Sequence, residues 1–244
     1  CGGCKWQHMK YDAQLLFKQK EVSENLKRIG GLELPELKPI LPVENPYWYR
    51  NKMEFSFSNQ RWLTKEEVDS GAEFNRNALG FHKPGMWDKI VDVSTCHLQA
   101  DPSNAIRNFV RAYAHENSIS FFDPKNKAGF LRSLMIRTTT TEEVMIVLQV
   151  FHKEDTILFP LLDAVEQEFP EITSLQYVIN GKANDTLYDQ EIVCYKGQDY
   201  ITEVMEALQF RITAKSFYQT NSLQAYELYK VVRELADLQG DELV

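Results

Sequence analysis

The chain has 244 residues, 43% of them hydrophobic and 12% aromatic, which is sufficient for a buried core in one large or two small domains. No apolar run approaches the roughly 18 residues of a membrane-spanning helix and the first residues do not resemble a secretory signal, so we expect a cytoplasmic protein without a membrane partner. The formal net charge of -8 argues against a protein that coats nucleic acid by bulk electrostatics, although a local basic groove is compatible with it.

The first predicted element is a helix over residues 11–29, where apolar side chains recur at helical spacing until two glycines end it. The next segment, GLELPELKPILPVENP, contains four prolines, which predict an extended connector. Residues 47–60 alternate between apolar and polar side chains, as a half-buried strand does. Two further short strands are predicted within residues 79–93, with a turn at KPG.

Helices and strands follow one another irregularly in the rest of the chain. A helix over residues 103–116 has Asp101 as a candidate N-cap and Pro102 in a favoured first position. Residues 131–137 and 143–151 predict an antiparallel hairpin. A helix is expected at 155–168, short strands at 175–180, 191–195, 200–205 and 208–212, and a last helix at 221–238 before Gly240. This irregular order predicts an α+β fold with a mostly antiparallel sheet.

Both ends of the chain look unfinished. It opens on a cysteine and stops after DELV, which turns from charged to apolar as a new strand would. We therefore expect a fragment of a longer protein.

The opening CGGC motif is compatible with a redox pair or with part of a metal site. A redox pair of the thioredoxin type has a strand before the motif, which is missing here. A metal site is favoured, because CxxC lets Cys1 and Cys4 face one ion and the glycines permit the tight turn. Cys96 is a candidate third ligand, with His8 and His97 as zinc-binding alternatives, whereas a lone cysteine is ordinarily a small buried apolar residue. Any fourth ligand would lie upstream of Cys1.

Cations and aromatic residues are interleaved in YWYRNK, GFHKPG and FLRSLMIR. Such a pattern suits RNA, whose bases stack on aromatic rings while its phosphates meet Arg and Lys. The alternative is ordinary strand faces with snorkelled cations. The candidate RNA-binding cations are Arg50, Lys52, Arg132 and Arg137.

Several segments, in order along the whole chain, resemble the RNA uracil-5-methyltransferases. They are CGGCKWQHM, YRNKMEFSF, the VDVSTCHL context of Cys96, SLQYVINGKANDT, the run from Gly197 to Glu203, and FRITAKSFYQTNSLQAYELY. The combination of KSFYQTN with CGGC and the distant cysteine is specific. More narrowly, the chain is similar to the branch that carries an iron–sulfur cluster and modifies ribosomal RNA.

The resemblance implies that the whole protein has an RNA-binding β-barrel, a central cluster domain and a Rossmann-like methyltransferase domain. This chain would hold a cluster-binding loop at 1–9, a helix at 10–31 that docks on the methyltransferase domain, the central α+β domain at 40–213, and the truncated start of the methyltransferase domain at 214–244. Both flanking helices would expose apolar faces, through which the fragment is expected to self-associate.

The resemblance also assigns residues. Cys1, Cys4 and Cys96 match three of the four ligands of a 4Fe-4S cluster, and a fragment without the fourth ligand can lose it. Gln219 matches the family's glutamine contact to S-adenosylmethionine, and Phe217 beside it would face the target base in the RNA.

The implied reaction makes 5-methyluridine in ribosomal RNA through a covalent adduct between a cysteine and uracil. The nucleophile and the proton-abstracting carboxylate both belong to the part of the family's sequence that this chain lacks. We therefore predict no catalytic residue here and no methyl transfer by the chain alone.

Two other classes of protein remain open. A non-catalytic RNA-binding module held by zinc would use the same cysteines and basic strands without S-adenosylmethionine. A thiol redox protein would need Cys1 and Cys4 as a pair and would not need Cys96.

Overall fold

The chain divides after Pro46 into two units. The structure is a computed structural model and describes residues 1–239. The smaller unit spans Gly2–Pro46, and the larger one begins at Tyr47 and includes Cys1. The division falls at the end of the proline-rich connector. The expected stop of the last helix at Gly240 lies outside the described residues, as does the DELV segment.

The smaller unit consists of one helix and the connector, which runs back along it. The helix α1 spans Tyr11–Glu24 and continues as a π-helical turn, η1, over Asn25–Ile29, so the predicted helix is confirmed. Gln19 holds the connector, because its side chain donates to the Lys38 carbonyl at 3.0 Å and accepts from the Ile40 amide at 2.7 Å.

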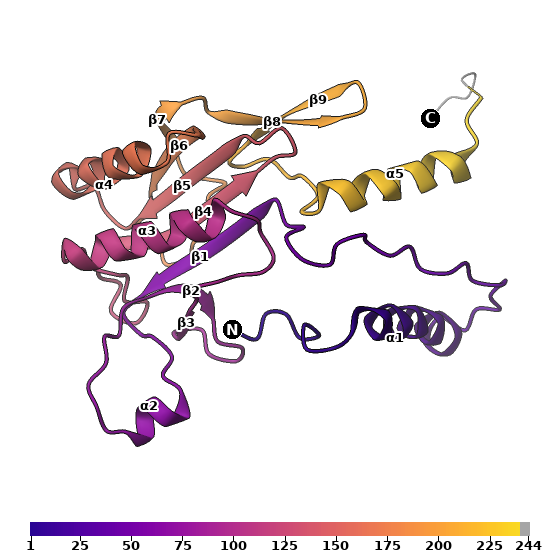
Figure 1. The fold of residues 1–244 in the computed structure, drawn as a ribbon, viewed down its shortest axis with the longest axis horizontal. Coiled ribbons are helices and arrows are strands. Elements are labelled where there is room, and N and C mark those ends of the chain that lie inside the picture. Colours follow the sequence, from indigo (N-terminus) through magenta and orange to yellow (C-terminus); the bar gives the residue numbers. More distant parts are fainter. Residues whose placement is uncertain (240–244) are drawn as a thin grey trace. The chain divides into compact units, whose positions relative to one another are not determined.

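The larger unit is built on a seven-stranded sheet with the order β3-β2-β1-β4-β5-β6-β7 (Figure 1). Its neighbouring strands are antiparallel except for β5 and β6, which are parallel and are joined by the crossover helix α4. The predicted α+β fold with a mostly antiparallel sheet is confirmed. The strands are β1 Lys52–Ser58, β2 Ala78–His82, β3 Ile90–Asp92, β4 Leu131–Thr138, β5 Val144–Val150, β6 Ile172–Ile179 and β7 Val193–Gly197.

Two helices, α3 (Ser103–Glu116) and α4 (Asp155–Glu168), cover one face of this sheet (Figure 1). Alternate strand residues such as Leu134 and Ile136 join the core on the helical side. Their neighbour Met135 points to the opposite face, as the two-residue period of a strand requires.

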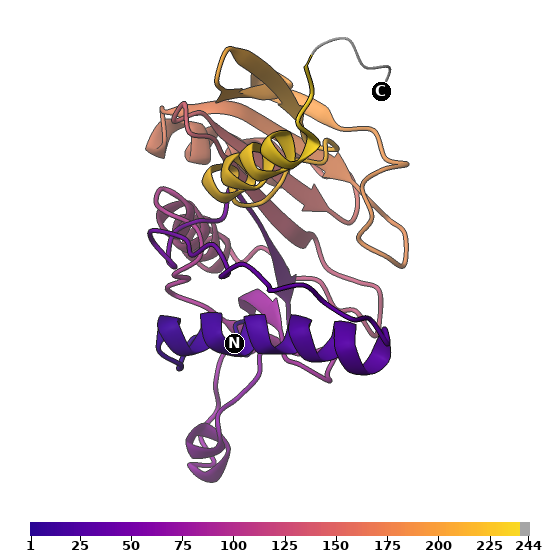
Figure 2. The same cartoon turned by 90° about the vertical axis from the view of Figure 1, so that its right-hand side faces the viewer.

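A separate two-stranded ribbon, β8 (Tyr200–Met205) with β9 (Leu208–Thr213), packs on the opposite face of the sheet. Ile201 and Ile212 of the ribbon share a buried cluster with Met135 and Met145. The last helix, α5 (Ser222–Ala236), lies beside the ribbon (Figure 2). The large unit therefore has three layers.

One short helix, α2 (Lys65–Asp69), was not predicted, although its sequence signal is plain. Thr64 and Glu67 form a capping box, in which each side chain bonds the other residue's amide. No helix among the described residues has both the length and the apolar character needed to cross a membrane.

Candidate functional site

The FYQTN segment, residues 217–221, connects β9 with α5 and carries the predicted cofactor contact Gln219. Asn51, just before β1, holds the backbone of this segment at two points. Its amide donates to the Thr220 carbonyl at 2.8 Å, and its side chain donates to the Gln219 carbonyl at 2.8 Å. The Gln219 side chain is exposed and has no hydrogen-bond partner among the described residues, so it is available to a ligand.

The side chains of Phe217 and Gln219 are exposed, whereas the backbone on either side of them is held by hydrogen bonds. The ring of Phe217 is 85% exposed. At Ser216, the residue before Phe217, the backbone carbonyl accepts a hydrogen bond of 2.6 Å from the buried Arg137 of β4. At the other end, the Asn221 side chain caps α5 by accepting from the Gln224 amide at 3.0 Å. The backbone is thus fixed while two side chains face solvent.

A pocket of about 490 Å³ lies next to this segment, between the start of β1, the β4–β5 turn and the start of α5. Trp48 lines it in a left-handed conformation, with φ of 58°, which is uncommon for a bulky residue and is a form of backbone strain. Three carboxylates, Asp101, Glu142 and Glu171, share the lining with one guanidinium, that of Arg50. Because negative side chains outnumber positive ones, the lining disfavours the binding of a phosphate and favours the binding of a neutral or cationic group.

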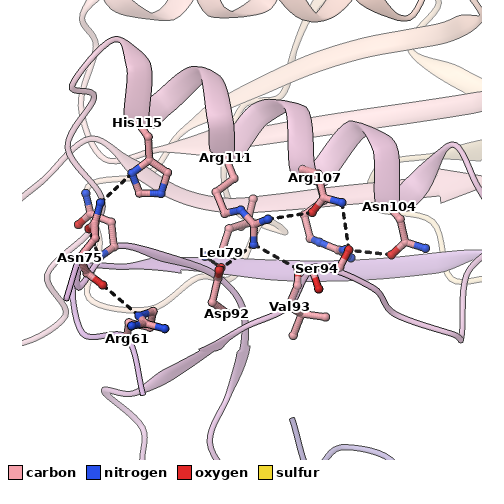
Figure 3. Close-up of polar contacts among 12 residues, drawn as sticks. Arg61, Asn75, Leu79, Asp92, Val93, Ser94, Asn104, Arg107, Arg111 and His115 are labelled. Atoms are coloured by element: carbon pink, nitrogen blue, oxygen red, sulfur yellow. Dashed lines mark hydrogen bonds and ion pairs between the residues drawn. The ribbon is translucent and has the colours of Figure 1, made fainter. Parts of the chain in front are cut away.

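Cys96 lies in the turn between β3 and α3, where it packs partly buried against the main core while polar side chains hold the backbone around it. The Arg107 guanidinium, fully buried on α3, donates to the Ser94 carbonyl at 2.6 Å and to Asn104 at 2.9 Å (Figure 3). Arg111 on the same helix face pairs with Asp92 at 2.7 Å. Burial lowers the pKa of Arg107, an effect that the charge of Cys96 opposes.

A shared cluster on Cys1, Cys4 and Cys96 stays a prediction. Cys1 is exposed, Cys4 and Cys96 are partly buried, and all three are free thiols. Cys4 belongs to the Gly2–Pro46 unit, whereas Cys96 belongs to the larger one. No group of three metal-binding side chains is found among residues 1–239.

The four predicted RNA-binding cations have different surroundings. Arg50 is partly exposed beside the pocket, and Lys52 pairs with Glu54 at 2.6 Å. Arg132 and Arg137 are 2% and 4% exposed, and both donate to backbone carbonyls inside the molecule. Contact with RNA stays a prediction for these two, and their burial speaks against it, because a buried guanidinium cannot meet a phosphate.

Sequence reasoning missed two residues that shape this region, Asn51 and Glu203. Asn51 stands in an alternating stretch where nothing distinguishes it from a surface residue. Glu203 had a signal: in YITEVM it falls on the same strand face as the buried Ile201, and a carboxylate on an inward face requires donors.

No family model matches the chain. It is 52% identical to a protein of Porphyromonas gingivalis and 50% identical to one of Bacteroides thetaiotaomicron, both named uncharacterized RNA methyltransferase, and all of the chain is aligned in each case. It covers 54% and 55% of their lengths, so the chain spans about half of these relatives.

A solved structure shares the fold over nearly the whole chain. It is the Pyrococcus abyssi tRNA (uracil-54, C5)-methyltransferase in complex with S-adenosyl-L-homocysteine, with a TM-score of 0.69 and 29% sequence identity. The match covers 96% of this chain and 50% of that protein.

Proposed function

We propose that this chain forms about half of an S-adenosylmethionine-dependent RNA methyltransferase that methylates carbon 5 of uridine. The observation that carries the proposal is the match of 96% of the chain to a uracil C5 methyltransferase bound to S-adenosyl-L-homocysteine. The names of the two relatives, identical at about half of their aligned positions, support the same class of reaction.

Gln219 is the residue through which this chain would contact the cofactor, which supplies the methyl group when bound. Its side chain is exposed and free of partners in the described residues, while its backbone is held by Asn51. A fixed backbone below an uncommitted amide is the geometry of a preorganised ligand contact. Phe217, also exposed, offers a flat ring to a base that has left its stack.

The proposed reaction needs groups that we place outside this chain. A cysteine thiolate would add to the uracil ring, and the adjacent carbon would take the methyl group from the sulfur of S-adenosylmethionine, which leaves as S-adenosyl-L-homocysteine. A carboxylate would then remove the proton from that carbon so that the thiolate leaves. This chain would contribute binding and positioning, and we predict that it transfers no methyl group when isolated.

Ribosomal RNA is the substrate that we propose, on the likeness of the cysteine pattern to the cluster-bearing branch. The solved relative acts on tRNA by its name. The substrate test therefore includes both RNAs.

An iron–sulfur cluster on Cys1, Cys4 and Cys96 is a further part of the proposal. Thiolates are the right donors for such a cluster. The described residues do not assemble three ligands, so no step of the reaction is assigned to a cluster. Iron and sulfide in the anaerobically purified full-length protein, lost in Cys96→Ala, would support a cluster ligand at Cys96. Zinc, or no metal in either protein, would contradict it.

The test of function is methyl transfer by the full-length protein from labelled S-adenosylmethionine to ribosomal RNA and tRNA transcripts. We expect 5-methyluridine in ribosomal RNA, and Gln219→Ala should weaken S-adenosyl-L-homocysteine binding about tenfold, as loss of a polar contact does. Gln209→Ala, at an exposed glutamine of β9, is the matched control. RNA binding without methyl transfer or cofactor binding would instead indicate a non-catalytic module.

A further inference from the structure

Glu203 of β8 is fully buried, at 0% exposure, and forms no ion pair with any cation of the described residues. A buried carboxylate without a cation is costly unless hydrogen-bond donors surround it. The donors around Glu203 come from three different elements, and they lead to the segment that carries Gln219.

One carboxylate oxygen ties the ribbon to the β4–β5 turn. Oε1 accepts from the Thr140 amide at 3.1 Å, from the Thr140 hydroxyl, and from the Val204 amide at 3.2 Å. All three groups are donors, so this oxygen is an acceptor only.

The other oxygen ties the ribbon to the first residue of α5. Oε2 accepts from the Ser222 hydroxyl at 2.7 Å. The same hydroxyl oxygen accepts from Nδ2 of Asn51 at 2.9 Å, and the second proton of that amide goes to the Gln219 carbonyl at 2.8 Å.

The direction of every bond in this chain is fixed by chemistry. The Asn51 Nδ2 group can only donate, so Ser222 receives one of its protons. Ser222 has a single hydroxyl proton, which it therefore gives to Glu203. The chain therefore ends on two acceptors, the Glu203 carboxylate and the Gln219 carbonyl; the carboxylate orients the Ser222 hydroxyl, which in turn orients the Asn51 amide toward Gln219.

We propose that Glu203 is a positioning residue for cofactor binding, which holds the Gln219 backbone in place through Ser222 and Asn51. This rests on the proposed function, in which Gln219 contacts S-adenosylmethionine. Glu203 itself has no exposed atom with which to touch the cofactor or RNA. Its effect is to preorganise the segment, so that ligand binding does not have to order it.

Glu203→Gln is the sharp test, because it keeps the size of the side chain and changes one oxygen into a donor. If the new amide group faces Thr140 and Val204, it opposes their N–H groups. If it faces Ser222, the serine hydroxyl proton loses its acceptor. The first orientation removes the tie to the β4–β5 turn while Ser222 keeps its acceptor, and the second breaks the hydrogen-bond relay from Glu203 through Ser222 and Asn51 to Gln219.

Glu206→Gln is the matched control. Glu206 also links the ribbon to α5, through Tyr226 at 2.9 Å and Arg233 at 3.0 Å, but it is exposed and does not reach Gln219. A general loosening of α5 on the ribbon would appear in both variants, whereas loss of the relay would appear only in Glu203→Gln.

The experiment uses the full-length protein and two readouts, S-adenosyl-L-homocysteine affinity by calorimetry and hydrogen exchange of the amides at 217–222. We expect Glu203→Gln to weaken binding about tenfold and to speed exchange across this segment, with RNA affinity unchanged. Ser222→Ala interrupts the relay at its next link and should act alike, which covers the case that Glu203→Gln does not fold.

The two readouts separate failure of this proposal from failure of the proposed function. Wild-type affinity and exchange in both Glu203→Gln and Ser222→Ala would overturn the positioning role while leaving the methyltransferase intact. The wild-type protein could fail to bind S-adenosyl-L-homocysteine while Glu203→Gln still speeds hydrogen exchange. That result would overturn the proposed function and, with it, the link between Glu203 and the cofactor. Equal losses of S-adenosyl-L-homocysteine affinity in Glu203→Gln and Glu206→Gln would contradict the specific positioning role. They would show that Glu203 only stabilises the packing of α5 on the ribbon.

Discussion

Asn104 bonds the backbone of Cys96 on both sides: its Oδ1 accepts from the Cys96 amide at 2.8 Å, and its Nδ2 donates to the Cys96 carbonyl at 3.1 Å. Asn104, in the first turn of α3, therefore fixes the loop that carries the Cys96 thiol. The turn is thereby held by a side chain that is itself buried, at 9% exposure.

Asn104→Asp is expected to lower the free energy of unfolding by about 2 kcal/mol. The substitution removes the donor to the Cys96 carbonyl and sets a carboxylate oxygen against it. Urea unfolding measures the loss, and the rate of thiol modification at Cys96 should rise. Asn25→Asp is the control, because Asn25 is exposed and its side chain holds no backbone carbonyl in the described residues. Equal stability of Asn104→Asp and wild type would refute the role of this pair.

Arg132 is expected to be a structural residue. Its guanidinium donates to the carbonyls of Asn180 at 2.6 Å and Lys182 at 2.8 Å, and it lies 4.5 Å from the centroid of the Phe122 ring. Arg132→Met leaves two carbonyls without their donor, so we expect a loss of about 3 kcal/mol in urea unfolding.

The control for Arg132 is Arg211→Met, which removes an exposed arginine stacked on Tyr200 and should change stability by about 0.5 kcal/mol or less. An Arg132→Met protein that is as stable as wild type but binds RNA more weakly would restore the RNA-contact interpretation of Arg132.

Asp123 should contribute stability that depends on pH. Hydrogen bonds from the Asn59 side chain and the Asn126 amide lower its pKa to about 2. A carboxyl whose pKa is lower in the folded state stabilises that state above its ordinary value near 3.8, and the contribution is lost as pH falls toward 2.

The measurement is the difference in unfolding free energy between wild type and Asp123→Asn across pH 7 to 2. We expect about 1 kcal/mol at pH 7, after allowance for solvent screening, shrinking below pH 4. A difference that stays constant over this range would show that the charge of Asp123 contributes nothing.

Most of the fold could be predicted because its signals are local. The helices α3 and α4 begin and end where the apolar period and the flanking residues indicate. The parallel pairing of β5 with β6 was missed, because two strands separated by a helix give no local sign of their direction. The capping box before α2 was a local sign that was overlooked.

The site was harder to predict than the fold, because its support is assembled from distant parts of the chain. FYQTN is visible in the sequence, but Asn51 contacts it across 168 positions. The sequence predicts Arg132 and Arg137 as candidate RNA-binding cations, because a strand sequence does not reveal what lies above each face. Burial against carbonyls from later segments decided their placement.

The exposed face of α5 gives the last prediction, that the isolated chain self-associates. Leu228, Val232 and Leu235 are 51%, 55% and 71% exposed and lie three or four residues apart, so they form one apolar stripe on the helix.

Sedimentation velocity of the 244-residue chain should show a concentration-dependent shift to larger species. Leu228→Ser combined with Val232→Ser should abolish it, because each change removes apolar area without adding charge. Glu234→Ser, also on α5, should leave the shift unchanged. Since burial of a stripe by a second domain would remove the driving force, the full-length protein should remain monomeric; equal association of both proteins would mean that the contact lies elsewhere.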